Sequence, residues 1–222
     1  MAKNNKSKDI DTRQVFDSMR YLYVKGMLNP EVIDIVSQYA LFDQLQNFHP
    51  EDADGQIPGT HSQYADPVME SLLLKLHPSM EEITGLTLYP TYSFYRVYKA
   101  GDILHKHIDR PACEISTTVC FNFDYKDLNG KYDWPIWMVD TPVTMLPGDG
   151  VIYRGCELTH WREQLEVPEG SWHVQAFFHY VDANGPNATS KFDSRPYIGF
   201  KDPMSSAMER VVSNKKYITF TE

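Results

Sequence analysis

The second half of the chain alternates short β-rich segments with turns, and this pattern constrains the fold more than any other feature. From about residue 86 the segments are rich in β-branched and aromatic residues and are separated by Gly, Pro, Asp and Asn. They read LTLYPTYSFYRVY, EISTTVCFNFD, YDWPIWMVD, TPVTML, GVIYRG and WHVQAFFHYVD. Because helical segments precede these closely spaced strands, we expect an α+β fold that is mainly β. The expected architecture is a double-stranded β-helix, or jelly roll, backed by N-terminal helices.

Two long helices are indicated before the strands. The first has Asn29 as its N-cap, a proline at the first helical position and an apolar stripe at helical spacing. The second has Asp66 as its N-cap, again followed by a proline. Because proline lacks the N–H that a helix needs, this second helix is expected to end by Pro78, with a further short helical piece after it.

The length of 222 residues indicates one domain with a sizeable core. We expect a flexible tail over residues 1–14 and a single domain over residues 15–222. Within that domain, helical support is expected over about 15–85 and a β core over about 86–182. Residues 183–222 are then a C-terminal extension, in which a strand or two and a short helix are expected.

Charge and cysteine content restrict the partners and the compartment. A formal net charge of -9 argues against a general nucleic-acid binder, which carries a basic surface. Three cysteines without CxxC spacing indicate reduced thiols in a cytoplasmic protein. The polar start has no apolar signal-peptide core, and no apolar run is long enough for a membrane span, so no membrane partner is expected. Nothing in the sequence indicates an oligomeric state.

A pattern of potential metal ligands lies in the segment HKHIDRP. Alternate residues of an extended strand share one face, so His105, His107 and Asp109 are three candidate ligands on one side. Two histidines and one carboxylate form the non-haem Fe(II) site that leaves coordination positions open. His160, in GCELTHWRE, follows a strand bounded by glycines and is a candidate from another part of the chain. The alternation alone does not choose among these residues.

The ordered set of motifs resembles the Fe(II)/2-oxoglutarate-dependent dioxygenases of the prolyl 4-hydroxylase type. The resemblance rests on YRVYKAGDILHKHIDRPACEISTTVCFNFD, GDGVIYRGCELTHWRE and VQAFFHYVD, within residues 86–182. It implies that His107, Asp109 and His160 are the metal ligands and catalytic residues. It also implies Fe(II) as the metal, 2-oxoglutarate as the co-substrate and ascorbate as a reductant.

The resemblance further implies hydroxylation of an unactivated C–H bond, coupled to decarboxylation of 2-oxoglutarate. The presence of Asp109, where related halogenases have Gly or Ala, favours hydroxylation. The implied substrate is a prolyl residue in a peptide or protein. One alternative is a free amino acid or another small metabolite. An alternative from another class is a non-catalytic, cupin-like metal- or ligand-binding protein.

The cation that should hold the far carboxylate of 2-oxoglutarate departs from the family pattern. The family has Arg or Lys nine or ten residues beyond the distal histidine, where this chain has Glu169 and Gly170. Arg162 is the preferred substitute, because it shares the face of His160 on a continuing strand and an arginine fork matches a carboxylate. Alignment through FFHYVD places His173 in the cation's slot instead.

Two residues of the strand YSFYRVY complete the expected co-substrate site. Tyr98 corresponds to the family tyrosine whose hydroxyl donates toward 2-oxoglutarate. Arg96 alternates with Tyr98 on this strand and is a further candidate for the cation.

Overall fold

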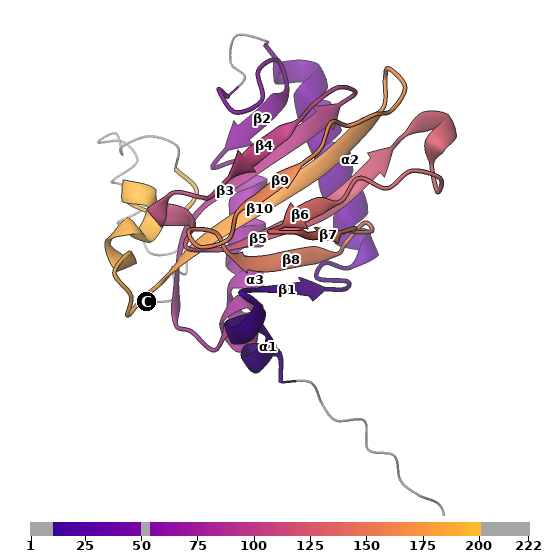
Figure 1. The fold of residues 1–222 in the computed structure, drawn as a ribbon. Helices are drawn as coiled ribbons and strands as arrows, with labels where there is room; N and C mark the ends of the chain where they lie inside the picture. Colours follow the sequence, from indigo (N-terminus) through magenta and orange to yellow (C-terminus); the bar gives the residue numbers. More distant parts are fainter. Residues whose placement is uncertain (1–10, 50–53, 201–222) are drawn as a thin grey trace, which may run out of the picture.

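The structure is a computed structural model that describes residues 11–49 and 54–200. Two antiparallel sheets dominate it, and the helices cover one face of the larger sheet (Figure 1). The helices are α1 (Thr12–Met19), α2 (Pro30–Asn47) and α3 (Pro67–Thr84), with short 3-10 turns η2 (Pro111–Cys113), η3 (Lys126–Leu128) and η4 (Ala188–Ser194). None of the helices in the described part has the length and apolar character of a membrane span.

The six-stranded sheet has the order β1-β8-β5-β10-β3-β2, and the four-stranded sheet has the order β4-β9-β6-β7. All strand pairs are antiparallel. The first sheet contains β1 (Tyr21–Val24), β2 (His61–Tyr64), β3 (Leu88–Lys99), β5 (Ile115–Asp124), β8 (Gly150–Arg154) and β10 (Trp172–Asp182). The second contains β4 (Leu104–His107), β6 (Ile136–Met138), β7 (Thr141–Val143) and β9 (His160–Arg162). The expected α+β class, mainly β, is confirmed.

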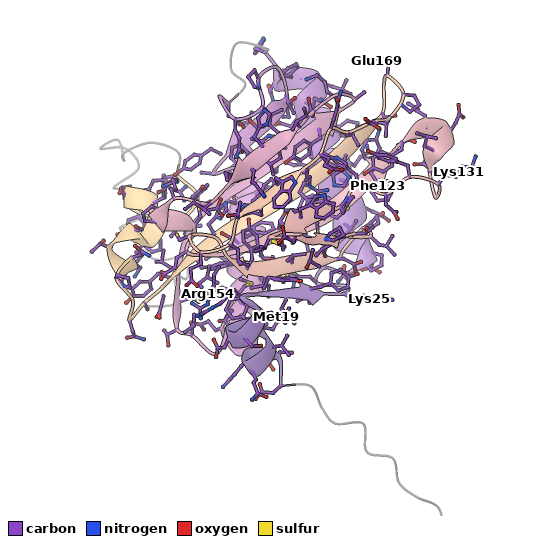
Figure 2. The ribbon with its side chains drawn as sticks, in the orientation of Figure 1. Met19, Lys25, Phe123, Lys131, Arg154 and Glu169 are labelled. Atoms are coloured by element: carbon purple, nitrogen blue, oxygen red, sulfur yellow. The ribbon has the colours of Figure 1, made fainter. Side chains whose placement is uncertain are left out.

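Side-chain alternation along β10 divides the interior into two layers. Val174, Ala176 and Phe178 belong to the core between the six-stranded sheet and the helices. The intervening side chains, which include His173 and Gln175, face the space between the two sheets. Side chains fill that space, and Figure 2 shows Lys131 and Glu169 at the tips of two loops that project from one end of it. The buried arginine described below lies in this inter-sheet layer.

The predicted boundaries are partly wrong on the N-terminal side. Asp11 caps α1, so the boundary of the predicted tail at residue 14 falls inside a helix; residues 1–10 lie outside the described residues. The short strands β1 and β2 join the edges of the six-stranded sheet within the segment predicted as helical support. Helix α3 continues through Pro78 to Thr84, because burial of Met80 beyond the proline offsets the one lost hydrogen bond.

The described part of the C-terminal extension packs across the six-stranded sheet. Arg195 forms a buried ion pair with Glu70 of α3, at 3.1 Å. Asp193 pairs with both terminal nitrogens of Arg110, at 2.7 Å each, and accepts a hydrogen bond from Tyr64. The extension is thereby tied to the loop that follows Asp109. The strands and helix predicted beyond residue 200 lie outside the described residues.

Candidate metal and co-substrate site

The structure brings the three predicted metal ligands together. His107 ends β4 and His160 begins β9, and these two residues lie directly opposite each other in the antiparallel pair. The Asp109 Oδ1 atom lies 3.6 Å from the Nε2 atom of His107 and 3.5 Å from that of His160. One ligand atom from each of the three residues falls within 4.8 Å of the others. We call these three residues the ligand triad.

Backbone carbonyls orient both imidazoles of the ligand triad. The Nδ1 of His107 donates to the His105 carbonyl at 2.7 Å, and the Nδ1 of His160 donates to the Leu158 carbonyl at 2.9 Å. A hydrogen on Nδ1 of a neutral imidazole leaves the lone pair on Nε2. Because these Nε2 atoms face Asp109, the lone pairs converge with the carboxylate, as metal ligation requires.

The prediction that His105 shares the face of His107 is wrong, because β4 is not a regular strand. The register between β4 and β9 shifts between Leu104 and His107, which marks a β-bulge or irregularity. Leu104 is buried, and the side chain of His105 is exposed. After the irregularity, His107 faces His160 while His105 still faces solvent. His105 contributes only its backbone carbonyl to the ligand triad.

The Asp109 carboxylate is held by the segment that follows β8. The backbone N–H of Asp109 donates to the Gly155 carbonyl at 2.9 Å. The Ser116 hydroxyl donates to Asp109 Oδ2 at 3.4 Å. A Cβ on Gly155 would lie 2.4 Å from Asp109 Oδ2 and 2.3 Å from the Cys113 carbonyl oxygen, so only glycine fits there.

The electrostatics of the ligand triad suit a divalent metal. Burial raises the pKa of Asp109, but the neighbouring histidines, His160 first, outweigh it, so this pKa lies below its usual value. Burial and the neighbouring His160 lower the pKa of His107. One carboxylate and two imidazole nitrogens on one face fit the 2-His-1-carboxylate donor set of non-haem Fe(II) sites.

A cavity of about 370 Å³ opens beside the ligand triad. Its wall combines polar groups with the apolar side chains Phe94, Leu104 and Phe177. His179 also lines it and forms, with Asp109 and Cys113, a second group of potential ligands. Burial lowers the pKa of His179 to about 4. Sequence reasoning missed His179, although alternation from His173 along the last strand would have placed it on the inward face.

Arg162 is fully buried on β9, two residues after His160. Its guanidinium donates to the Trp134 carbonyl and to Gln175 Oε1 (3.2 Å) and lies 4.4 Å from the centroid of the Trp134 ring. It forms no ion pair with any carboxylate in the described ranges. Burial lowers the pKa of Arg162, but an arginine stays protonated at neutral pH. Arg162 does not line the cavity; its cross-strand partner Leu104 does.

A chain of buried neutral groups surrounds this arginine. Gln175 Oε1 accepts from His173 Nε2 at 2.8 Å, and Gln175 Nε2 donates to the Thr118 hydroxyl at 2.6 Å. The Tyr125 hydroxyl lies 2.7 Å from His173 Nδ1 and donates to it, because Nε2 carries the ring hydrogen. Burial and then Arg162 lower the pKa of His173 to about 3. We call Arg162 and these four partners the buried arginine network; its one charge is Arg162.

The remaining predicted co-substrate residues lie on β3. Tyr98 is fully buried and its hydroxyl accepts from Arg96 Nη1 at 3.3 Å, which leaves the hydroxyl hydrogen free to donate. Tyr98 also lies near Arg162. Arg96 pairs with Asp54 and lines the cavity. The two arginines thus flank one phenol, but only Arg96 has a carboxylate partner.

Comparison with known proteins finds likeness in structure and none in sequence. No family model matches the chain, and no curated protein matches it significantly. A Pseudomonas putida prolyl-4-hydroxylase is similar, with a TM-score of 0.58 and 14% identity over 76% of this chain and 96% of that one. The non-haem α-ketoglutarate-dependent epimerase SnoN from nogalamycin biosynthesis has a TM-score of 0.64 and 14% identity, over 87% and 91% of the two chains.

A viral collagen prolyl hydroxylase from Paramecium bursaria Chlorella virus-1 is also similar. Its TM-score is 0.53 at 13% identity, over 75% of this chain and 99% of that one. The resemblance inferred from the sequence motifs is therefore confirmed at the level of the fold: the chain has the fold of prolyl 4-hydroxylases and related 2-oxoglutarate-dependent enzymes.

Proposed function

We propose that this protein is a Fe(II)- and 2-oxoglutarate-dependent dioxygenase that hydroxylates an unactivated C–H bond. The observation that carries the proposal is the convergence of His107, Asp109 and His160 in a chain with this fold. The described residues then form a single oxygenase domain in which the two sheets close into a double-stranded β-helix.

The ligand triad would hold the metal ion through two Nε2 atoms and the Asp109 carboxylate. Iron bound there with 2-oxoglutarate and dioxygen supplies the oxidising chemistry. The chain contributes position and charge. The carbonyls of His105 and Leu158 fix the two rings, and the ionised Asp109 neutralises part of the metal's charge. Phe94, Leu104 and Phe177 form an apolar part of the cavity wall, against which the hydrocarbon part of a substrate would pack.

Arg162 is the proposed anchor for the far carboxylate of 2-oxoglutarate. A buried cation without a carboxylate partner is unfavourable unless a ligand supplies the negative charge. His173 is a weaker candidate, because a group with a pKa of about 3 is neutral at pH 7. Arg96 is weaker as well, because Asp54 already pairs with it. The free hydroxyl hydrogen of Tyr98 is placed to donate to the same carboxylate.

A prolyl residue in a peptide or protein is the substrate that the resemblance favours, and two of the similar structures are prolyl hydroxylases. A free amino acid or small metabolite is the second candidate, supported by a cavity of about 370 Å³ that one small molecule fills. The three free cysteines support a reducing, cytoplasmic location, and ascorbate would keep the iron reduced.

The proposal is tested with purified protein, Fe(II), 2-oxoglutarate and ascorbate. We expect 2-oxoglutarate to bind in the absence of oxygen, and succinate release once oxygen and a panel of prolyl peptides and amino acids are added. His160→Ala should abolish both metal binding and succinate release, whereas His105→Ala, with an exposed side chain, should preserve both. Metal binding without any binding of 2-oxoglutarate would instead support a non-catalytic, cupin-like protein.

A further inference from the structure

A turn before β2 places an amide at the metal-facing side of the cavity. Gln56 lies in this turn with its side chain exposed, and its Nε2 atom is 3.3 Å from the Nε2 atom of His107. This contact spans 51 positions of the sequence. Because His107 Nδ1 carries the ring hydrogen, its Nε2 accepts and the Gln56 amide donates. The amide therefore approaches the atom that would ligate the metal.

The orientation of the Gln56 amide is determined by its other contacts. Its Oε1 accepts from Arg96 Nη2 at 3.2 Å, so its NH2 group must be the end that faces His107. Asp54 Oδ1 accepts from the backbone N–H groups of Gln56 (2.8 Å) and Ile57 (3.0 Å), which fixes the turn. Its Oδ2 accepts from Arg96 and from the Ser62 hydroxyl. Both carboxylate oxygens of Asp54 therefore already accept hydrogen bonds, from the turn, from Ser62 and from Arg96.

A metal on His107 would take the lone pair to which Gln56 donates. The amide NH2 would then remain in the cavity wall, beside the metal, as a donor without an acceptor. Because Gln56 is exposed, water can bond to this donor, and a ligand oxygen that replaces the water keeps the hydrogen bond.

Arg96 supplies a second donor in the same wall. Its side chain is 1% exposed and lines the cavity, and its Nε atom has no hydrogen-bond partner among residues 11–49 and 54–200. Its two terminal nitrogens are already bonded to Tyr98, Asp54 and Gln56. Once a metal occupies His107 Nε2, the Gln56 amide and the Arg96 Nε–H are therefore two donors without an acceptor among the described residues, beside the Arg96–Asp54 ion pair.

We propose that Gln56 and Arg96 form a carboxylate subsite for the primary substrate. Two donors match the two oxygens of a carboxylate, and the hydrogen bond from the guanidinium Nε–H is charge-assisted. This inference rests on the proposed function and selects among its substrates. An amino acid or small organic acid with a free carboxylate fits, whereas a prolyl residue within a peptide has no carboxylate to offer.

The test uses the full-length protein loaded with Mn(II) and 2-oxoglutarate, which binds without turnover. Free amino acids and small carboxylic acids are titrated calorimetrically, each beside its own carboxamide. We expect at least one acid to bind, and its amide to bind about tenfold or more weakly, because a lost charge-assisted bond is worth roughly that factor. Gln56→Leu and Arg96→Met should each weaken binding of the acid by about tenfold or more, and Gln56→Leu should leave the affinity for 2-oxoglutarate within about twofold.

Gln46→Leu is the matched control, since Gln46 is an exposed glutamine of α2 and does not line the cavity. Gln56→Leu keeps the test interpretable if Arg96→Met fails to fold, because Gln56 is exposed. The proposal is overturned if no acid binds to protein that binds 2-oxoglutarate, if acid and amide bind equally, or if Gln56→Leu has no effect. A loss of 2-oxoglutarate affinity in Gln56→Leu overturns it too, and assigns this amide to the co-substrate.

Failure of the proposed function gives a different result. In that case the wild-type protein does not bind 2-oxoglutarate at all. The titration of acids and amides on the Mn(II) protein alone then still decides the subsite.

Discussion

The ligand triad and the buried arginine network meet on one short strand, β9, and have opposite electrostatic character. The triad concentrates two imidazole lone pairs and one negative charge beside an open cavity. The network places one positive charge among neutral groups and, within the described residues, has no carboxylate to pair with it. A molecule with a metal-chelating end and a distant carboxylate satisfies both regions. The difference between the two regions teaches that a buried charge without a partner of opposite sign marks a place where a ligand can bind.

The largest expected effect comes from breaking the triad. Asp109→Ala removes its only negative charge, and we expect Mn(II) or Fe(II) affinity to fall by more than about 100-fold, since changes to outer-shell partners alone weaken metal binding by about 10–100-fold. Equilibrium dialysis measures this directly. His105→Ala is the control two strand positions before His107, and a similar loss in both variants would refute the assignment of the ligands.

The second-largest expected effect is a pH dependence of stability that comes from His173, a neutral member of the buried arginine network. Burial holds the pKa of His173 at about 3, against about 6.5 in the unfolded chain, so the unfolded state binds more protons between these values. Stability from this residue is complete above about pH 6.5 and is lost as the pH falls toward 3, by roughly 2 kcal/mol at pH 5. Because His179, with a pKa of about 4, loses stability over the same range, urea unfolding at pH 7 and pH 5 should show a loss in the wild type that is larger by roughly 2 kcal/mol than the loss in His173→Gln. Equal pH dependence in the two proteins would show that His173 is not buried as a neutral residue.

A smaller effect is expected from the support of the triad. Gly155→Ala introduces a Cβ that overlaps Asp109 Oδ2 and the Cys113 carbonyl, so the carboxylate must move. We expect metal affinity to fall by about tenfold, the lower end of the range for groups that orient a ligand. Gly55→Ala adds the same atom where nothing lies within 4 Å and is the control. Unchanged metal affinity in Gly155→Ala would mean that the loop adjusts without displacing Asp109.

The smallest expected effect is on stability, and it tests whether Arg162 in the buried arginine network serves ligand binding or folding. Arg162→Met removes two hydrogen bonds but also a desolvated charge, and we expect the free energy of unfolding without 2-oxoglutarate to change by no more than about 1 kcal/mol. Denaturant unfolding of the ligand-free protein measures it. A loss of about 3 kcal/mol or more would identify Arg162 as a structural residue, since breaking a buried pair has that effect.

Sequence patterns correctly predicted the features that depend on neighbouring residues alone, such as where helices begin and which strand residues point inward. The N-caps Asn29 and Asp66 begin α2 and α3 as expected, and alternation on β9 places His160 and Arg162 together in the interior. The irregularity in β4 was not predictable, because no glycine or proline within the strand marks it and it is visible only in the pairing with β9.

Contacts between distant segments were also beyond the sequence pattern. Gln56 lies in a turn-forming segment that gives no sign of its approach to His107. The pairing of Arg96 with Asp54 depends on that same turn, so periodicity on β3 indicated that Arg96 points inward but not which charge it meets. The edge strands β1 and β2 have only four residues each and are defined by their neighbours in the sheet.

The most direct test of the account is the affinity of the Mn(II)-loaded protein for 2-oxoglutarate, measured by calorimetry without oxygen. Arg162→Met should lose at least about 30-fold in affinity, because removing one partner of a desolvated charge pair costs about 2–5 kcal/mol. Its affinity for Mn(II) should not change. Arg154→Met, an arginine of β8 that pairs with Asp17, should match the wild type in both measurements. Equal 2-oxoglutarate affinity in Arg162→Met and the wild type would contradict the account.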